Sequence, residues 1–155
     1  MADVYFTDTS ALAKRYVTET GTAWLQTILN PSTGCSAYIV RITAVELIAA
    51  IIRRERGATI TPADAAAART AFRTHVSTEY NVIEFTEELA NRAMTLAETY
   101  GLRGYDAIQL AAALDVNGSY HAARLPTITL ISADAELNAA AASEGLRVEN
   151  PNMYP

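Results

Sequence analysis

Val4–Tyr16 reads VYFTDTSALAKRY, and this stretch joins two kinds of secondary structure through an aspartate. Val4–Thr7 is a short run of β-type residues, and the residues after Asp8 have the apolar spacing of a helix. The same order returns late in the sequence, where Thr127–Ile131 is the clearest strand and Asp134–Ala142 has helical spacing. We therefore predict that the fold is built from strands that lead directly into helices.

The remaining sequence continues this alternation. Helices are predicted at Thr22–Leu29, Thr43–Arg56, Pro62–Val76, Thr86–Tyr100 and Gly104–Leu114. Further strands are predicted at Cys35–Tyr38, Asn81–Phe85 and, at an edge, Leu146–Val148, with Asn117-Gly118 in a polar loop. This order predicts an α/β fold, namely a three-layer sandwich whose mainly parallel central sheet is flanked by helices, with right-handed connections.

Length and composition indicate one domain that spans residues 1–155. Half of the residues are hydrophobic, which is enough to bury a substantial core, and no linker or low-complexity tract divides the sequence. The first residues, MADVYFTD, include no basic segment, and the longest uncharged runs are too short to span a bilayer. We therefore expect a cytoplasmic protein that has no membrane partner.

Few residues are available for soft-metal or redox chemistry. Cys35 is the only cysteine, and His75 and His121 are the only histidines. A single cysteine cannot form an internal disulfide, and these three residues do not make a zinc cluster. The formal net charge is −5, which argues against a nonspecific nucleic-acid coat because phosphate binding generally needs a basic surface.

Four acidic residues lie at positions where an ionised side chain needs a structural or functional explanation. Asp8 and Asp134 each follow a predicted strand, and the ligand crevice of an open parallel sheet lies at the carboxyl ends of its strands. Glu46 interrupts the apolar face of ITAVELIAAII, and Asp106 lies in the first turn of the apolar segment GYDAIQLAAAL. Each acid alone has a simpler explanation, since an aspartate can cap a helix and a buried acid can pair with a distant arginine.

A cluster of all four carboxylates would need a counter-charge. At separations of about 6 Å and an effective dielectric of about 20, each pair repels by roughly 3 kcal/mol. Protons or a cation must offset this repulsion. Hard oxygen ligands favour Mg²⁺ or Mn²⁺, which bind substrate phosphates and activate water.

The segments around the four acids resemble the acidic motifs of PIN-domain ribonucleases, and most closely those of the VapC-type toxins of bacterial toxin–antitoxin pairs. The matching segments are FTDTSALAKRY with Asp8, TAVELIAAI with Glu46, RGYDAIQLAAAL with Asp106 and LISADAEL with Asp134. They occur in order and cover nearly the whole sequence. The resemblance implies a PIN-like fold and a Mg²⁺-dependent endoribonuclease, commonly dimeric, that a cognate antitoxin holds inactive.

The resemblance also implies a catalytic role for each acid. Asp8, Asp106 and Asp134 would be metal ligands, and Glu46 would bind the metal directly or orient a bound water. A metal-activated water would then hydrolyse an RNA phosphodiester without a covalent enzyme intermediate. Ser10 matches the polar residue that often supports the first motif. Neutralising the four acids would take the formal charge from −5 to −1.

Basic and apolar residues near these motifs each have two possible roles. Arg103 is close to Asp106 in the sequence, and we expect it either to contact RNA phosphate or to form an ion pair. Lys14-Arg15 and the Arg53-Arg54-Arg56 cluster are more typical of solvated faces than of RNA contacts. A groove for an antitoxin helix and ordinary core packing would each explain the side chains of Tyr16, Trp24 and Leu25.

Two other functions remain open. A non-enzymatic interaction domain is favoured if the four acids are scattered caps and ion pairs. An aspartate-based phosphoacceptor domain also places an aspartate after a parallel strand, but it would need a lysine in the site, and the only lysine is Lys14. Glycine-rich nucleotide binding is not supported, because neither glycine fingerprint follows the first strand.

Overall fold

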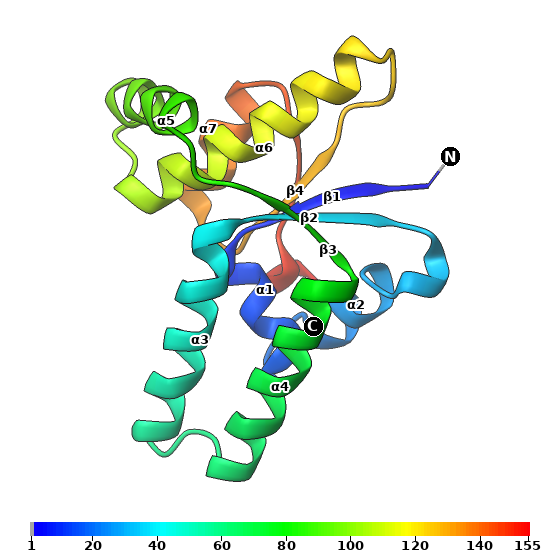
Figure 1. The fold of residues 1–155 in the computed structure, drawn as a ribbon, viewed down its shortest axis with the longest axis vertical. Helices are drawn as coiled ribbons and strands as arrows, with labels where there is room; N and C mark the ends of the chain where they lie inside the picture. Colours follow the sequence, from blue (N-terminus) through cyan, green and yellow to red (C-terminus); the bar gives the residue numbers. More distant parts are fainter. Residues whose placement is uncertain (1) are drawn as a thin grey trace.

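A five-stranded sheet lies at the centre of the computed structural model, which describes residues 2–155, so that Met1 of the predicted domain lies outside the described residues (Figure 1). The strands are β1 (Val4–Thr7), β2 (Ser36–Val40), β3 (Tyr80–Ile83), β4 (Thr129–Ile131) and β5 (Arg147–Glu149). They lie in the order β3-β2-β1-β4-β5, and every neighbouring pair is parallel. Throughout the described residues the sheet is therefore parallel, where the sequence predicted a mainly parallel one.

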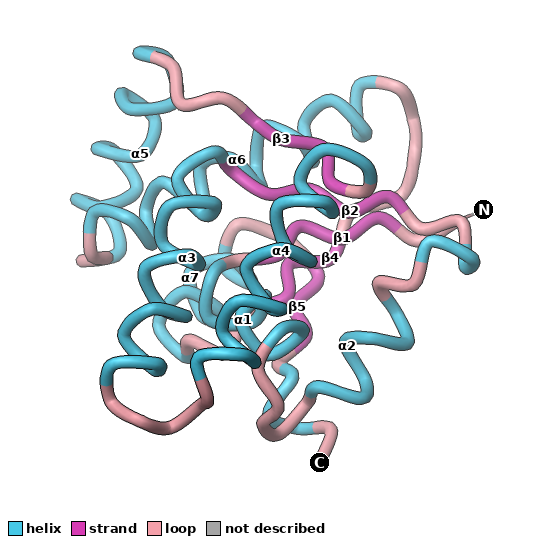
Figure 2. The backbone as a smooth tube through the Cα atoms, turned by 60° about the horizontal axis from the view of Figure 1, so that its bottom comes forward, coloured by secondary structure: helices cyan, strands magenta, loops and turns pink. Residues whose placement is uncertain are grey.

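Helices cover both faces of this sheet (Figure 1). One face carries α1 (Thr9–Tyr16), α2 (Thr22–Ile28), α3 (Arg41–Arg56) and α4 (Pro62–Thr78). The other carries α5 (Glu87–Tyr100), α6 (Gly104–Ala122) and α7 (Ala135–Ser143). Two short 3-10 helices, η1 (Pro31–Thr33) and η2 (Pro151–Met153), lie in the connections. The strands pass through the middle of the molecule between the helices (Figure 2), which confirms the predicted three-layer sandwich.

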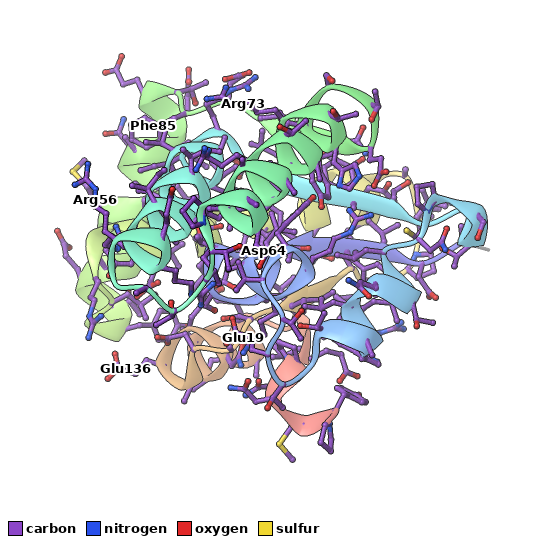
Figure 3. All side chains as sticks on the ribbon, turned by 90° about the horizontal axis from the view of Figure 1, so that it is seen from below. Glu19, Arg56, Asp64, Arg73, Phe85 and Glu136 are labelled. Atoms are coloured by element: carbon purple, nitrogen blue, oxygen red, sulfur yellow. The ribbon has the colours of Figure 1, made fainter. Side chains whose placement is uncertain are left out.

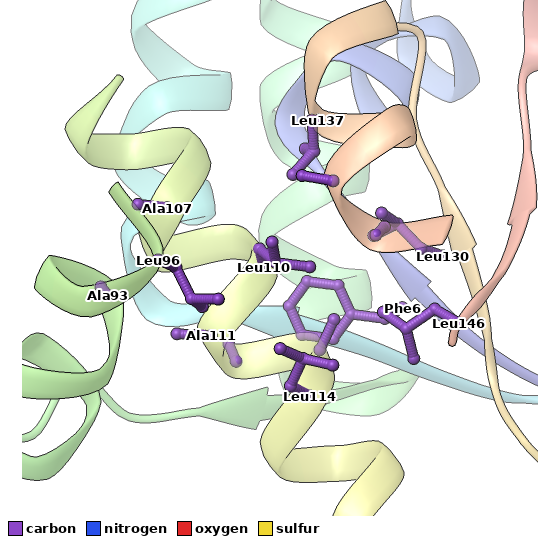
Figure 4. Packing of buried hydrophobic residues seen from close by; sticks show 14 of the residues in the cluster. Phe6, Ala93, Leu96, Ala107, Leu110, Ala111, Leu114, Leu130, Leu137 and Leu146 are labelled. Atoms are coloured by element: carbon purple, nitrogen blue, oxygen red, sulfur yellow. The ribbon is translucent and has the colours of Figure 1, made fainter. Parts of the chain in front are cut away.

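Side chains that alternate along the strands fill two cores, one on each face of the sheet. Phe6 and Val40 pack with residues of α5, α6 and α7, among them Leu110 (Figure 4). Ile39 faces the opposite way and packs with Leu47 of α3. Successive residues of a strand point to opposite faces, so one strand contributes to both cores.

The helix that carries Asp106 is longer than the sequence predicted. α6 continues through Asn117 and Gly118, which were expected in a polar loop. A glycine inside a helix costs about 1 kcal/mol relative to alanine, but tertiary contacts offset that cost here. Val116 is buried, and the Asn117 side chain accepts a hydrogen bond from the Ile128 N–H at 3.1 Å. Even so, none of the helices in the described part of the chain is long and apolar enough to cross a bilayer.

Strand boundaries differ from the prediction by a few residues. β2 continues through Ile39 and Val40, whose side chains are fully buried on opposite faces of the sheet. β3 ends at Ile83, and Phe85 lies in the exposed connection to α5 (Figure 3). The predicted edge strand is confirmed as β5, whose one partner among the described strands is β4.

Leu110→Ala should destabilise the protein by about 2–5 kcal/mol, because Leu110 is fully buried and the smaller side chain leaves a cavity. Urea denaturation followed by circular dichroism measures the loss. Leu125→Ala is the control, since Leu125 is 38% exposed, and it should cost about 1 kcal/mol or less. Equal losses in the two variants would contradict this placement of the core.

Candidate functional site

The carboxyl ends of β1 and β4 bring two of the predicted acids to the same edge of the sheet. The strands pair in parallel, and the Asp8 N–H donates to the Ile131 carbonyl at 3.1 Å. Asp8 is the N-cap of α1 and accepts from the Ala11 N–H at 3.0 Å. Asp134 is the N-cap of α7 and accepts from the Leu137 N–H at 2.8 Å. Both aspartates therefore cap helices and also meet at one sheet edge, so capping does not exclude a functional role.

Ser10 links the two loops that carry these aspartates. Its hydroxyl lies 2.9 Å from both oxygens of the Asp8 carboxylate, to which it donates. The same hydroxyl oxygen accepts from the Ala133 N–H at 3.0 Å. One side chain thus fixes the orientation of Asp8 relative to the loop that leads to Asp134.

Glu46 reaches the same region from α3. Its Oε1 accepts from the Thr9 hydroxyl at 2.9 Å and lies 3.4 Å from the amide nitrogen of Gln109. No ion pair in the described residues includes Glu46. Neutral donors, rather than a distant arginine, therefore hold this carboxylate.

Asp106 lies in the first turn of α6 and is buried, but it is not the cap of that helix. The N-cap is Arg103, which makes no side-chain capping bond. Burial raises the pKa of Asp106 to about 6, and the charges of Asp134 and Glu46 raise it as well, whereas Arg103 lowers it. A carboxylate that served mainly to bind free N–H groups would have a lowered pKa. Asp106 therefore belongs with the other acids.

Asp8 is more buried than Asp106, with 3% of its surface exposed. Burial raises the pKa of Asp8 to about 7, and the charge of Asp106 adds to the rise. Hydrogen bonds from the Ala11 N–H and from the hydroxyls of Ser10 and Ser132 act in the opposite direction. At neutral pH a positive charge beside Asp8 would favour its ionised form.

All four acids line one cavity of about 220 Å³. The other residues around it are Thr9, Ser10, Arg103, Tyr105 and Gln109. The structure thus brings together every residue that the sequence analysis proposed for the site, including the two supporting residues. The cavity has room for water or a small hydrated ion.

The chemistry of this lining suits a hard cation. Carboxylate, hydroxyl and amide groups offer oxygen ligands, and neither cysteine nor histidine lines the cavity. In the part of the chain that the structure describes, no three Asp, Glu, His or Cys side chains are already placed as a group that could hold a metal ion. The donor set nevertheless fits Mg²⁺ or Mn²⁺ in its chemistry.

Arg103 is the only basic residue that lines the cavity. It is exposed, and it takes part in none of the ion pairs found among the described residues. Lys14 and Arg54 both pair with Glu19, at 3.0 and 2.9 Å, and Arg15 also has an acidic partner. Lys14, Arg15 and Arg54 therefore serve the fold rather than the cavity.

Trp24 and Leu25 serve packing, whereas Tyr16 both packs and lines an open groove. Leu25 is fully buried, and Trp24 stacks on Tyr154 with ring centroids 4.1 Å apart. The Tyr16 hydroxyl lies 2.5 Å from that of Tyr80. The groove that Tyr16 lines has a volume of about 1110 Å³ and lies between the α1–α2 connection, the α3–α4 connection and α4.

Sequence reasoning missed the polar residues that hold the acids in place. These are Thr9, Thr43, Gln109 and Ser132, three of which are fully or almost fully buried. Gln109 offered a signal, because it is an amide three residues after Asp106 in an otherwise apolar segment. The others resemble ordinary cap and strand-end residues, and nothing local distinguishes them.

Residues 5–143 match the family model of the PIN domain, and this match includes all four acids. The chain belongs to the PIN domain family, whose members are generally nucleases. This confirms the resemblance that the four acidic segments indicated. No curated protein sequence gives a significant match.

Solved structures with a similar fold include VapC proteins. The structure of PAE2754 from Pyrobaculum aerophilum is 24% identical, with a TM-score of 0.63 over 96% of this chain and 90% of that chain. A chain of VapBC2 from Rickettsia felis, solved bound to a DNA fragment from its promoter, is 14% identical, with a TM-score of 0.63 over 95% and 98%. VapC20 from Mycobacterium tuberculosis, a sarcin-ricin loop cleaving toxin, is 19% identical, with a TM-score of 0.60 over 88% and 94%.

Asp106→Asn should stabilise the metal-free protein at pH 8 by about 1–3 kcal/mol, because it removes a buried charge and its repulsions. The pKa of Asp106 is raised to about 6 in the folded state, so the contribution of this one group to wild-type stability is greatest below about pH 4 and is lost as the pH rises through 6. The gain should therefore vanish near pH 4. Thermal melts in chelator at both pH values measure it.

Asp115→Asn is the control for this experiment, since it makes the same change at a half-exposed position of α6 that pairs with Arg92 and does not line the cavity. It should alter stability by no more than about 1 kcal/mol at either pH. If Asp106→Asn is less stable than wild type at pH 8 in chelator, Asp106 is an ordinary helix-terminal charge and the acids do not repel one another appreciably.

Proposed function

We propose that this protein is a Mg²⁺-dependent endoribonuclease and the toxin of a toxin–antitoxin pair, with residues 1–155 forming one PIN-like domain. The observation that carries the proposal is the cavity at the carboxyl edge of the sheet, which is lined by Asp8, Glu46, Asp106 and Asp134. Membership of the PIN domain family and the fold likeness to VapC structures support it. RNA is the proposed substrate because of the resemblance to PIN-domain ribonucleases, and one structural neighbour is a sarcin-ricin loop cleaving toxin.

Each residue of the cavity has a role in this proposal. Asp8, Asp106 and Asp134 would hold the cation, and Glu46 would hold it directly or through water. When bound, Mg²⁺ or Mn²⁺ would supply an activated water and offset the charge of the phosphate. Asp8 and Asp106 would release any remaining protons as the cation binds, because a positive charge lowers their pKa. Arg103 would attract the RNA backbone to the rim of the cavity.

The alternative functions have less support. A phosphoacceptor domain would place a lysine beside its aspartate, whereas Lys14 pairs with Glu19 and does not line the cavity. A non-enzymatic interaction domain gains nothing from buried acids that repel one another. The raised pKa values of Asp8 and Asp106 favour a site built for chemistry, because perturbed acids gather at functional sites.

Asp8→Asn and Asp106→Asn should each abolish RNA cleavage while the fold survives, because each removes a ligand charge from the cavity. Cleavage of labelled RNA by the purified protein, freed of any partner, provides the measurement. Activity should require Mg²⁺ or Mn²⁺ and should disappear in excess chelator. Asp115→Asn, on the outer side of α6, should cleave as wild type does.

Two results would contradict the metal-dependent nuclease. One is full activity of Asp106→Asn, and the other is cleavage that continues undiminished in excess chelator. Either result with a folded protein would favour the non-enzymatic interaction domain or a contaminating nuclease. Circular dichroism of each variant separates loss of function from loss of fold.

We further propose that a cognate antitoxin occupies the groove beside α4 and reaches the cavity from there. Ile60, Ala67 and Ala71 line the groove together with charged side chains, among them Glu55 and Asp64, and the small alanines would let a helix approach closely. The net charge of −5 favours a partner segment with basic residues.

A homodimer also follows from the family resemblance, and the exposed apolar side chains of Val45 and Met94 offer surfaces for it.

Expression of the wild-type protein alone should arrest growth, and co-expression with the adjacent small gene should relieve the arrest and yield a complex. Ala67→Arg should weaken that complex, because it places a long charged side chain in the groove, and RNA cleavage should not change. Ala66→Arg is the matched control, since it is exposed on the same helix but does not line the groove. A harmless wild-type protein that copurifies with no partner would contradict the toxin role, even if the nuclease remains.

A further inference from the structure

Gln109 is a buried amide beside the acidic cavity. It lies on α6 and is 1% exposed. Its Nε2 donates to the Thr43 hydroxyl at 2.9 Å and lies 3.3 Å from the Thr9 hydroxyl and 3.4 Å from Glu46 Oε1. One side chain thus connects α6 with α1 and α3, the helices that carry Thr9 and Glu46.

The nitrogen of this amide faces Glu46 for a chemical reason. Three oxygen atoms surround Nε2, and one belongs to a carboxylate. If the amide group were rotated by half a turn, its oxygen would face the Glu46 carboxylate. The amide oxygen would then compete with that carboxylate for the hydrogen of the Thr9 hydroxyl. In the present orientation Gln109 Oε1 is buried, and the described residues provide no partner for it. An unpartnered buried acceptor lowers stability, so this arrangement is unfavourable for folding alone.

An apolar side chain of similar length would fill this position without an unpartnered oxygen. The residues that follow, Leu110 and Ala111, are fully buried and apolar, as is usual for a helix packed into a core. Unlike an apolar side chain, the amide can orient the neighbouring polar side chains. It holds Glu46 directly and also through Thr9, whose hydroxyl donates to the same carboxylate oxygen at 2.9 Å.

We propose that Gln109 is a positioning residue that holds Glu46 in the orientation from which it supports cation binding. This inference rests on the proposed metal-dependent function, and it assigns Gln109 to the binding of the ion rather than to folding. Without the amide, Glu46 keeps only the Thr9 hydroxyl and turns more freely. The three aspartates then bind the cation with less help from the fourth acid.

Gln109→Met tests this inference, because methionine keeps the length of the side chain but has neither the donor nor the unpartnered oxygen. Isothermal titration of Mn²⁺ into the protein, without RNA, should give a Kd at least about 10-fold weaker than wild type. The melting temperature in chelator should equal or exceed that of wild type. Raising the Mg²⁺ concentration should restore much of the RNA cleavage. Asn91→Met, an amide exchange on the exposed side of α5, should leave the Mn²⁺ Kd unchanged.

Four outcomes have distinct meanings. Weaker Mn²⁺ binding with retained stability supports the positioning role. Mn²⁺ binding within twofold of wild type, in a wild-type protein that does bind Mn²⁺, overturns the role of Gln109 and leaves the proposed function intact. No Mn²⁺ binding by wild type overturns both. If Gln109→Met melts at a much lower temperature than wild type in chelator, the amide serves folding and the inference is wrong.

Discussion

The parallel pairing of β1 with β4 is the constraint on which the rest of the site depends. It ends both strands at one edge of the sheet, where Asp8 and Asp134 begin the helices that follow. α3 lies on one face of the sheet and α6 on the other, so Glu46 and Asp106 approach this edge from opposite layers. The acidic cavity therefore lies where the two helical layers and the sheet edge meet. No single layer could form it.

The acidic side chains of the cavity have two opposite effects, one on the ends of the helices and one on each other. Locally, Asp8 and Asp134 stabilise helix ends by accepting backbone hydrogen bonds. Collectively, the acids disfavour ionisation of two of their number: the charge of Asp106 raises the pKa of Asp8, and the charges of Asp134 and Glu46 raise the pKa of Asp106. Ser10, which bridges the two aspartate loops, holds the carboxylates in place despite their repulsion. Such a balance is typical of sites in which function takes precedence over stability.

Much of this architecture could be predicted because its signals are local. The hydrophobic periodicity and the capping residues predicted the strands and helices. The aspartates that follow strands predicted the sheet edge at which the site lies. The extension of α6 through Gly118 could not be predicted, since it depends on a contact between Asn117 and Ile128 that exists only in the folded chain. The partners of Gln109 lie 66 and 100 residues away in the sequence, so its role is visible only in three dimensions. The sequence could therefore indicate which acids lie together at the sheet edge but not what orients them.

The position of β1 in the sheet also has a consequence for protein synthesis. β1 lies between β2 and β4, and the chain reaches β4 only at Thr129. On the ribosome, one edge of β1 therefore stays open while β2, β3 and six of the helices are made. A nascent chain that stops before β4 contains neither that strand nor Asp134, and the cavity is incomplete. Premature release during translation thus yields a chain that lacks the assembled acids, so the site first exists late in the synthesis of each molecule.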